Sequence, residues 1–129
     1  MKYIAIDLGL KRIGLAYSAH KEIVTPLEAV HRKNRDQAAR DVKKILDEWN
    51  SDALVIGIPM GGTSEDEMRR RVEHFLSLLN FTGEVFYQDE TQSSIEAEEL
   101  IKGEMKSIRD GRIDSISAMI ILQRFLGHL

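Results

Sequence analysis

The spacing of hydrophobic residues changes along the chain, and each spacing predicts a different element. Residues 2–7, 12–18 and 23–30 have the short apolar or alternating runs of β-strands, with polar turns between them. Alternation along the first strand predicts two faces, with Tyr3, Ala5 and Asp7 on one and Ile4, Ile6 and Leu8 on the other. Pro26 lacks the N–H that a central strand needs, so we expect the third strand at a sheet edge or with a bulge. The chain therefore opens as an antiparallel meander.

Helical spacing follows the meander. Residues 36–50 and the segment after Ser64 each repeat apolar residues at intervals of 4, 3, 1 and 3, which is typical of amphipathic helices. Ser64 with Glu67 predicts a capping box at the start of the second helix, and a similar pair predicts a third helix over residues 93–102. Trp49 fits the apolar stripe of the first helix, so we expect it in the core.

Two further strands and a last helix complete the predicted fold. Residues 53–58 are apolar throughout, as expected of a strand that is buried on both faces, and residues 84–89 form another strand. Residues 113–126 are almost all apolar and predict a deeply buried helix. The order of elements predicts an α/β fold with a mixed five-stranded sheet and helices on both faces. The even composition predicts a single domain over residues 1–129.

Composition narrows the possible functions. The 129 residues include no cysteine, which excludes disulfides, thiolate metal sites and a cysteine nucleophile. The chain has no 18-residue apolar run and no signal-peptide core, so we expect a cytoplasmic protein without a membrane partner. The net charge of −3 argues weakly against wholesale coating of nucleic acid. It does not exclude a nucleic-acid enzyme, because affinity comes from local basic patches and catalytic acids lower the total charge.

Carboxylates follow the ends of the first and last strands. Asp7 ends the first strand and Asp89-Glu90 end the last one. In an open α/β sheet, the carboxyl ends of the strands form sites at one edge, which brings these acids together. Asp114 lies in the first turns of an otherwise apolar helix. The alternatives are a turn role for Asp7 and stabilisation of the helix N-terminus by Asp114, although Asp110 is better placed for the latter.

Converging carboxylates without a histidine or cysteine cluster suit a hard, oxygen-binding cation such as Mg²⁺ or Mn²⁺. Two such ions about 3.5–4 Å apart could activate water and stabilise the leaving oxygen of a phosphodiester. We therefore expect the carboxyl groups of Asp7 and Asp114 within one cation's span, roughly 4–7 Å apart. Alternation along the last strand indicates only that Asp89 and Glu90 point to opposite faces.

Four motifs with a family resemblance occur in order along the whole chain. Asp7-Leu8-Gly9 with Lys11-Arg12-Ile13-Gly14-Leu15-Ala16 resembles the opening signature of the YqgF/RuvX family, within the RNase H-like superfamily. Gly57-Ile58-Pro59 with Gly62-Thr63 resembles its glycine-rich loop, Asp89-Glu90 its Asp-Glu-Arg motif, and Asp114 with Ile121-Leu122-Gln123 its terminal helix. The resemblance implies an RNase H-like fold and a metal-dependent nuclease associated with 5′ maturation of 16S rRNA precursors, historically also proposed to resolve Holliday junctions.

The resemblance also implies roles for individual residues. It assigns the catalytic and metal-binding carboxylates to Asp7, Glu90 and Asp114, with Mg²⁺ or Mn²⁺ as the cofactor, and it selects Glu90 over Asp89. The residues that it places on the nucleic acid are Lys11, Arg12, Thr63, Ser64, Arg109 and Arg112. Lys11 and Arg12 also fit a solvated hairpin tip. The run Arg69-Arg70-Arg71 fits a solvated helix face better than a strip that binds a nucleic-acid backbone.

Some positions depart from the family pattern. Thr91 stands where the family has arginine, Gly61 replaces an aspartate of the loop, and Ser117 stands where RuvC-type resolvases carry a second acid. The leading function is an endonuclease that acts on structured RNA in ribosomal precursor particles. Thr91 and the net charge of −3 favour its alternative, a non-catalytic RNA-binding factor of ribosome assembly. A resolvase-like nuclease acting on branched DNA is a further alternative, and the oligomeric state stays open. A sugar- or acetate-kinase-like enzyme would need two such domains.

Overall fold

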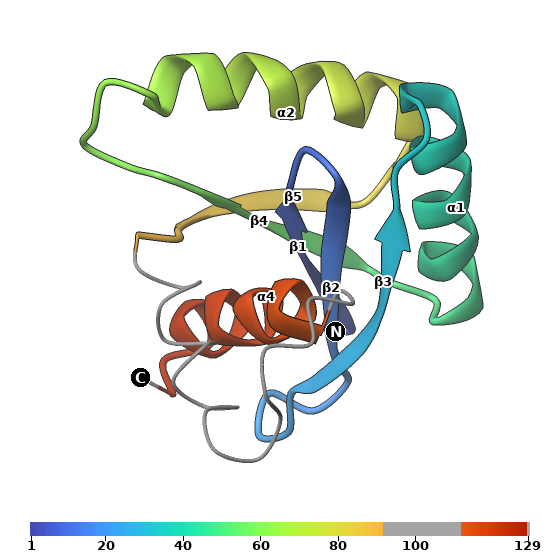
Figure 1. The fold of residues 1–129 in the computed structure, drawn as a ribbon. Helices are drawn as coiled ribbons and strands as arrows, with labels where there is room; N and C mark the ends of the chain where they lie inside the picture. The colour runs from blue at the N-terminus through green and yellow to red at the C-terminus, as the bar shows by residue number, and fades with distance from the viewer. Residues whose placement is uncertain (92–111, 129) are drawn as a thin grey trace.

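The computed structural model describes residues 1–91 and 112–128, which form helices on both faces of one sheet (Figure 1). The elements are β1 (Tyr3–Leu8), β2 (Arg12–Ser18), β3 (Thr25–His31), α1 (Arg35–Glu48), β4 (Ala53–Ile58), α2 (Glu65–Leu79), β5 (Glu84–Asp89) and α4 (Arg112–Phe125). The predicted helix over residues 93–102 and the predicted nucleic-acid contact Arg109 lie outside the described residues.

The sheet has the mixed five-stranded form that the sequence predicts. Its strand order is β3-β2-β1-β4-β5. The strands of the meander pair antiparallel, whereas β4 pairs parallel to both β1 and β5. The carboxyl ends of β1, β4 and β5 therefore meet at one edge of the sheet. The third strand is an outermost strand of the sheet, as Pro26 predicts. Pro26 pairs with Ala16, and the register irregularity between β3 and β2 lies further along, between Ile13 and Leu15.

Alternation along β1 divides the core into two layers, as the sequence predicts. Ile4, Ile6 and Leu8 belong to the layer that also holds the apolar side chains of α1 and α2. Tyr3 and Ala5 belong to the layer under α4. Figure 1 shows α1 and α2 together over one face of the sheet and α4 against the other. Every residue of β4 is buried because helices cover both of its faces.

The helix starts differ from the sequence prediction. Helix α1 has a capping box, in which Asn34 Oδ1 accepts the Gln37 N–H at 2.8 Å and Gln37 Oε1 accepts the Asn34 N–H at 3.3 Å. The capping box predicted for Ser64 is wrong, because Ser64 has helical backbone angles and its side chain makes no capping hydrogen bond. A cap side chain reaches the first helical N–H groups only from an extended backbone.

Trp49 is only partly in the core that the sequence predicts for it. Its side chain is 39% exposed, and its ring lies 4.5 Å from the ring of Tyr17. The helix ends at Glu48 and Trp49 is its C-cap residue, so the indole lies at the helix end and is left partly exposed to water. None of the helices in the described part of the chain is long and apolar enough to cross a membrane.

Candidate active site

Asp7 lies at the carboxyl end of β1, between β2 on one side and β4 on the other. Alternation places it on the face covered by α4. The carboxyl group is largely shielded by its neighbours, and this burial raises its pKa. A hydrogen bond with Glu90 acts in the opposite direction, and the negative charge of Asp114 raises the pKa further. Asp7 is thus held among other acids in a place where its ionised form is disfavoured.

Glu90 follows β5 directly and is brought beside Asp7 by the pairing with β4. Its backbone N–H donates to the Ile58 carbonyl oxygen at 2.9 Å, which extends the parallel ladder by one residue. Gly57 of β4 leaves the space for this approach, because a Cβ there would come within 3.1 Å of the Glu90 Cβ and would collide with Ile121 of α4. Only glycine lets the β5 terminus and α4 pack so closely at this point.

The Asp7–Glu90 carboxyl pair holds a proton. Burial, and then the negative charge of Asp7, raises the pKa of Glu90 to about 9. Near neutral pH the Glu90 carboxyl is therefore protonated and donates its hydrogen bond to Asp7. A cation can replace the proton that two carboxyl groups share in this way.

Asp89 occupies the opposite face and has a structural role. Its Oδ1 accepts the Met60 N–H at 3.2 Å, the Thr91 N–H at 3.0 Å and the Thr91 hydroxyl at 2.6 Å. The Thr91 hydroxyl and N–H keep the pKa of Asp89 below its ordinary value. The structure therefore brings Glu90, and not Asp89, against Asp7.

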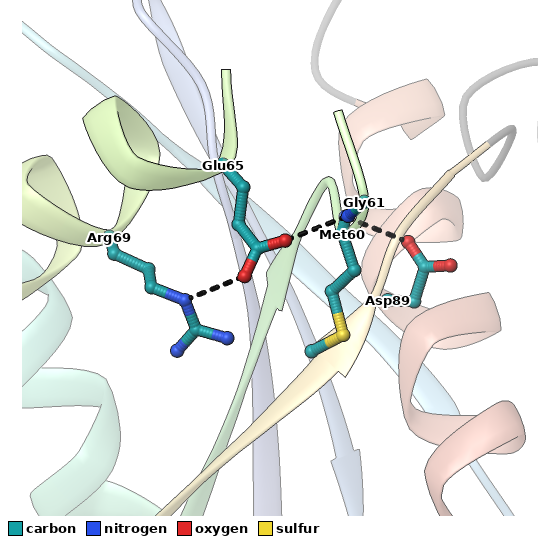
Figure 2. Close-up of polar contacts among 5 residues, drawn as sticks. All are labelled: Met60, Gly61, Glu65, Arg69 and Asp89. Atoms are coloured by element: carbon teal, nitrogen blue, oxygen red, sulfur yellow. Dashed lines mark hydrogen bonds and ion pairs between the residues drawn. The ribbon is translucent and has the colours of Figure 1, made fainter. Parts of the chain in front are cut away.

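Two carboxylates bind consecutive backbone N–H groups of the glycine-rich loop after β4 (Figure 2). Asp89 takes the Met60 N–H, and Glu65 Oε1 takes the Gly61 N–H at 2.7 Å. Glu65 Oε2 is in turn bound by Arg69 Nε at 3.0 Å. Glu65 thus fixes the loop to the start of α2, the role that the sequence predicts for Ser64. Gly61 has a positive φ of 79°, which a side chain would strain.

Asp114 reaches the site from the first turn of α4. Gly14 of β2 permits this, because a Cβ there would collide with the backbone carbonyl of Asp114. The Asp114 carboxylate is paired with Arg12, whose Nε lies 2.8 Å from Oδ2, and each side chain is about a quarter exposed. Arg12, a predicted phosphate contact, is therefore engaged with a predicted metal ligand.

Asp7, Glu90 and Asp114 border one cavity of about 580 Å³. Its lining residues are Asp7, Leu8, Gly9, Leu10, Pro59, Met68, Arg71, Glu90, Thr91 and Asp114. The three predicted carboxylates thus line the same space, although they come from distant parts of the sequence. Within residues 1–91 and 112–128, no group of three histidine, aspartate or glutamate side chains is already arranged to hold a metal ion. Asp7 and Glu90 fit a hard dication, whereas Asp114 could join them only by leaving Arg12.

Four predicted nucleic-acid contacts are exposed, and none of these four belongs to the lining of this cavity. Lys11 is exposed in the turn between β1 and β2, and Arg112 is exposed at the start of α4. Thr63 and Ser64 are exposed in the loop that precedes α2. Sequence reasoning favoured a solvated helix face for the run Arg69-Arg70-Arg71, whereas Arg71 lines the cavity from α2. The run of three arginines at its position was the available signal, but the helical spacing did not show that one of them faces the acids.

Comparison with known proteins identifies the family. Residues 1–128 match the family described as "RuvX: Holliday junction resolvase". The chain belongs to the RuvX family. It is 78% identical over 126 residues to a Sulfurimonas denitrificans protein named "Putative pre-16S rRNA nuclease", with 98% of this chain and 97% of the relative aligned. A Campylobacter lari protein of the same name is 54% identical over 127 residues, covering 98% of each chain.

Solved structures with the same fold are distant in sequence from this RuvX chain. Thermus thermophilus RuvC in complex with a Holliday junction has a TM-score of 0.54 at 12% identity, and the match covers 98% of this chain and 96% of RuvC. The fowlpox virus resolvase with junction DNA has a TM-score of 0.57 at 13% identity, and the match covers 99% and 98% of the two chains. These likenesses confirm the RNase H-like fold that the motifs imply.

Proposed function

We propose that this RuvX chain is a divalent-metal-dependent endonuclease that hydrolyses phosphodiester bonds in the 5′ maturation of pre-16S rRNA. The observation that carries the proposal is the Asp7–Glu90 carboxyl pair, which lines one cavity together with Asp114 at the carboxyl edge of the sheet. The substrate class comes from the names of relatives that are 78% and 54% identical and that align over almost their whole length. A substrate of this kind assigns the activity to the cytoplasm, on ribosomal precursor particles.

Asp7 and Glu90 are the residues that would hold Mg²⁺ or Mn²⁺. The Glu90 carboxyl must then lose the proton that its raised pKa retains, because oxygen ligands bind a dication as carboxylates. The chemistry that such ions supply is activation of water and stabilisation of the leaving oxygen. Hydrolysis assisted by two ions would also need Asp114, which must exchange its ion pair with Arg12 for the ion. The released Arg12 can then contact a phosphate of the substrate.

The exposed residues around the cavity supply the proposed contacts to the nucleic acid. Lys11 and Arg112 offer charge to phosphates, and the hydroxyl groups of Thr63 and Ser64 offer hydrogen bonds. Arg109 completes the set as a prediction from the sequence. Such contacts position the strand on the protein without reading its bases.

One observation favours a non-catalytic RNA-binding factor as the second candidate. The ion pair between Arg12 and Asp114 satisfies a carboxylate that a metal centre would need. If that pair persists in the presence of ions and substrate, the site cannot assemble three ligands. RNA would then be bound but not cut.

Cleavage and binding measured side by side distinguish the two candidates. A 5′-extended 16S precursor fragment is incubated with the protein in Mn²⁺ or Mg²⁺, and the Asp7→Asn variant is compared with it. We expect Asp7→Asn to abolish cleavage and to retain RNA binding, because the phosphate contacts are other residues. Asp47→Asn on α1, far from the cavity, is the matched control and should cut normally. Equal cleavage by Asp7→Asn would refute the site, and binding without cleavage by the unchanged protein would support the assembly factor.

A further inference from the structure

A second cavity adjoins the carboxylates and is lined by arginines. It has a volume of about 320 Å³ and lies between the turn after β1, the start of α1 and one side of α2. Four of its lining residues, which we call the arginine pocket, are Arg32, Arg35, Arg70 and Arg71. Among the lining residues that the structure describes, Glu67 is the one acid, so these groups give a net charge of +3 in a chain whose total is −3. Positive charge is thus concentrated in a recess rather than spread over the surface.

Glu67 lines the arginine pocket but is not ion-paired with any of its four arginines. In the part of the chain that the structure describes, none of its four arginines forms an ion pair with a carboxylate. Arg71 only approaches the sulfur of Met68, at 3.9 Å. Burial, and then the positive charges of Arg71 and Arg35, lower the pKa of Arg32. Guanidinium groups that crowd together without an ion-paired carboxylate form a site that an anion would stabilise.

The pocket is also attached to the carboxylate site. Arg32 donates a hydrogen bond from its guanidinium to the Gly9 carbonyl at 2.6 Å, and its N–H donates to the Lys11 carbonyl at 2.9 Å. These bonds fix it to the turn that begins two residues after Asp7. Leu8, Leu10 and Arg71 line both cavities, so the two spaces share a border. Leu10, which is 77% exposed, presents an apolar surface at that border.

We infer that the arginine pocket binds a backbone phosphate of the nucleic-acid strand, next to the phosphodiester that lies at Asp7 and Glu90. The inference rests on the proposed function. It adds the direction of the bound strand, which runs from the carboxylate site toward α2. Guanidinium groups match phosphate oxygens with paired hydrogen bonds. The border shared with the carboxylate cavity favours a phosphate of the same strand over a free phosphate or nucleotide. The exposed Leu10 between the two spaces offers an apolar contact to the sugar or base that joins them.

The double variant Arg35→Gln/Arg70→Gln tests the inference. Both side chains are exposed, and neither has a described hydrogen bond or ion pair, so their loss leaves the fold intact. Arg40→Gln/Lys44→Gln on α1 is the matched control, because it removes the same charge from exposed positions outside the pocket. Binding of a fluorescent 5′-extended 16S precursor fragment is measured by anisotropy over a range of KCl concentrations, in an Asp7→Asn background that prevents cleavage.

We expect the pocket variant to bind this RNA about tenfold or more weakly than the control. The slope of log affinity against log salt should fall by about 0.7–0.9 for each phosphate contact that is lost. Single phosphates of the RNA near the cleavage position are then replaced by neutral methylphosphonates. At one position the replacement should weaken binding to the protein with intact pocket arginines and leave binding to the pocket variant unchanged. Equal affinities and slopes for pocket variant and control would overturn the inference.

Two further arms distinguish a strand phosphate from a small anion and from a failure of the nuclease proposal. Inorganic phosphate and a nucleoside diphosphate are titrated against the protein while the melting temperature is recorded. One contrary result is that either anion raises the melting temperature at micromolar concentration in the unchanged protein but not in the pocket variant, while both proteins bind RNA equally. In that case the pocket is a small-molecule site and the inference is wrong. Cleavage by the protein with Asp7 intact is measured in parallel. Its absence would refute the nuclease proposal, while the affinities would still decide whether the pocket holds the strand.

Discussion

Replacing Glu90 by glutamine should make the metal-free protein more stable at alkaline pH. Glutamine has the shape of glutamate but cannot ionise, and its amide can donate a hydrogen bond to Asp7 as the protonated Glu90 does. Burial and the charge of Asp7 raise the pKa of Glu90 to about 9, from an ordinary value of 4.5. The folded state therefore binds this proton more tightly than the unfolded state. The stability of the unchanged protein should accordingly fall as the pH rises from about 4.5 to about 9.

The size of the effect follows from the same values. One pKa unit corresponds to about 1.4 kcal/mol, and pH 8 lies roughly 3.5 units above the ordinary glutamate value, which sets an upper limit of about 5 kcal/mol. Water reaches part of the Glu90 carboxyl, and Asp7 shares its proton, so we expect about 2 kcal/mol. For a chain of this length, that corresponds to a melting temperature roughly 6–10 °C higher at pH 8.

Thermal and urea unfolding in EDTA, from pH 5 to pH 9, measures the difference between Glu90→Gln and the unchanged protein. The difference should be near zero at pH 5 and should grow with pH. Glu84→Gln, at the exposed start of β5, is the matched control and should show no such growth. Mg²⁺ or Mn²⁺ should stabilise the unchanged protein more than Glu90→Gln. A stability difference that is the same at pH 5 and pH 8, or a less stable Glu90→Gln at pH 8, would refute the account of the carboxyl pair.

Three other substitutions test separate contacts. Arg12→Gln leaves Asp114 without its ion pair, so the affinity for Mn²⁺, measured by calorimetry, should rise several-fold; unchanged affinity would contradict competition between Arg12 and the ion. Gly14→Ala places a Cβ against the backbone carbonyl of Asp114, and we expect the free energy of unfolding in urea to fall by about 2–3 kcal/mol. The added Cβ of Gly62→Ala has no neighbouring atom within reach, so this control should change stability by less than about 1 kcal/mol. Asn34→Ala removes the cap of α1 and should cost about 1 kcal/mol by the same measurement, with restoration by Asn34→Ser.

For the part of the chain that the structure describes, the sequence by itself determined the elements and the faces of the sheet. The alternation of Tyr3 and Ala5 with Ile4 and Ile6 assigned each side chain to the correct core layer, because the pleat of a strand leaves two directions for side chains. The bounds of β2, β4 and β5 agree with the prediction, and β3 lies at an edge as Pro26 requires. These features depend on local backbone geometry and on the need to bury apolar faces. Both can be recognised from residues that are close together in the sequence.

Tertiary structure alone decided how the acids and arginines are partnered. Alternation separates Glu90 from Asp89, but only the parallel pairing with β4 and the space at Gly57 show which of them lies beside Asp7. The ion pair between Arg12 and Asp114 joins residues 102 positions apart. The arginine pocket likewise combines the turn after β1, the start of α1 and α2. The strength and effect of a charge depend on the distance to its partners and on burial, and both are set by the packing of segments that are remote in the sequence.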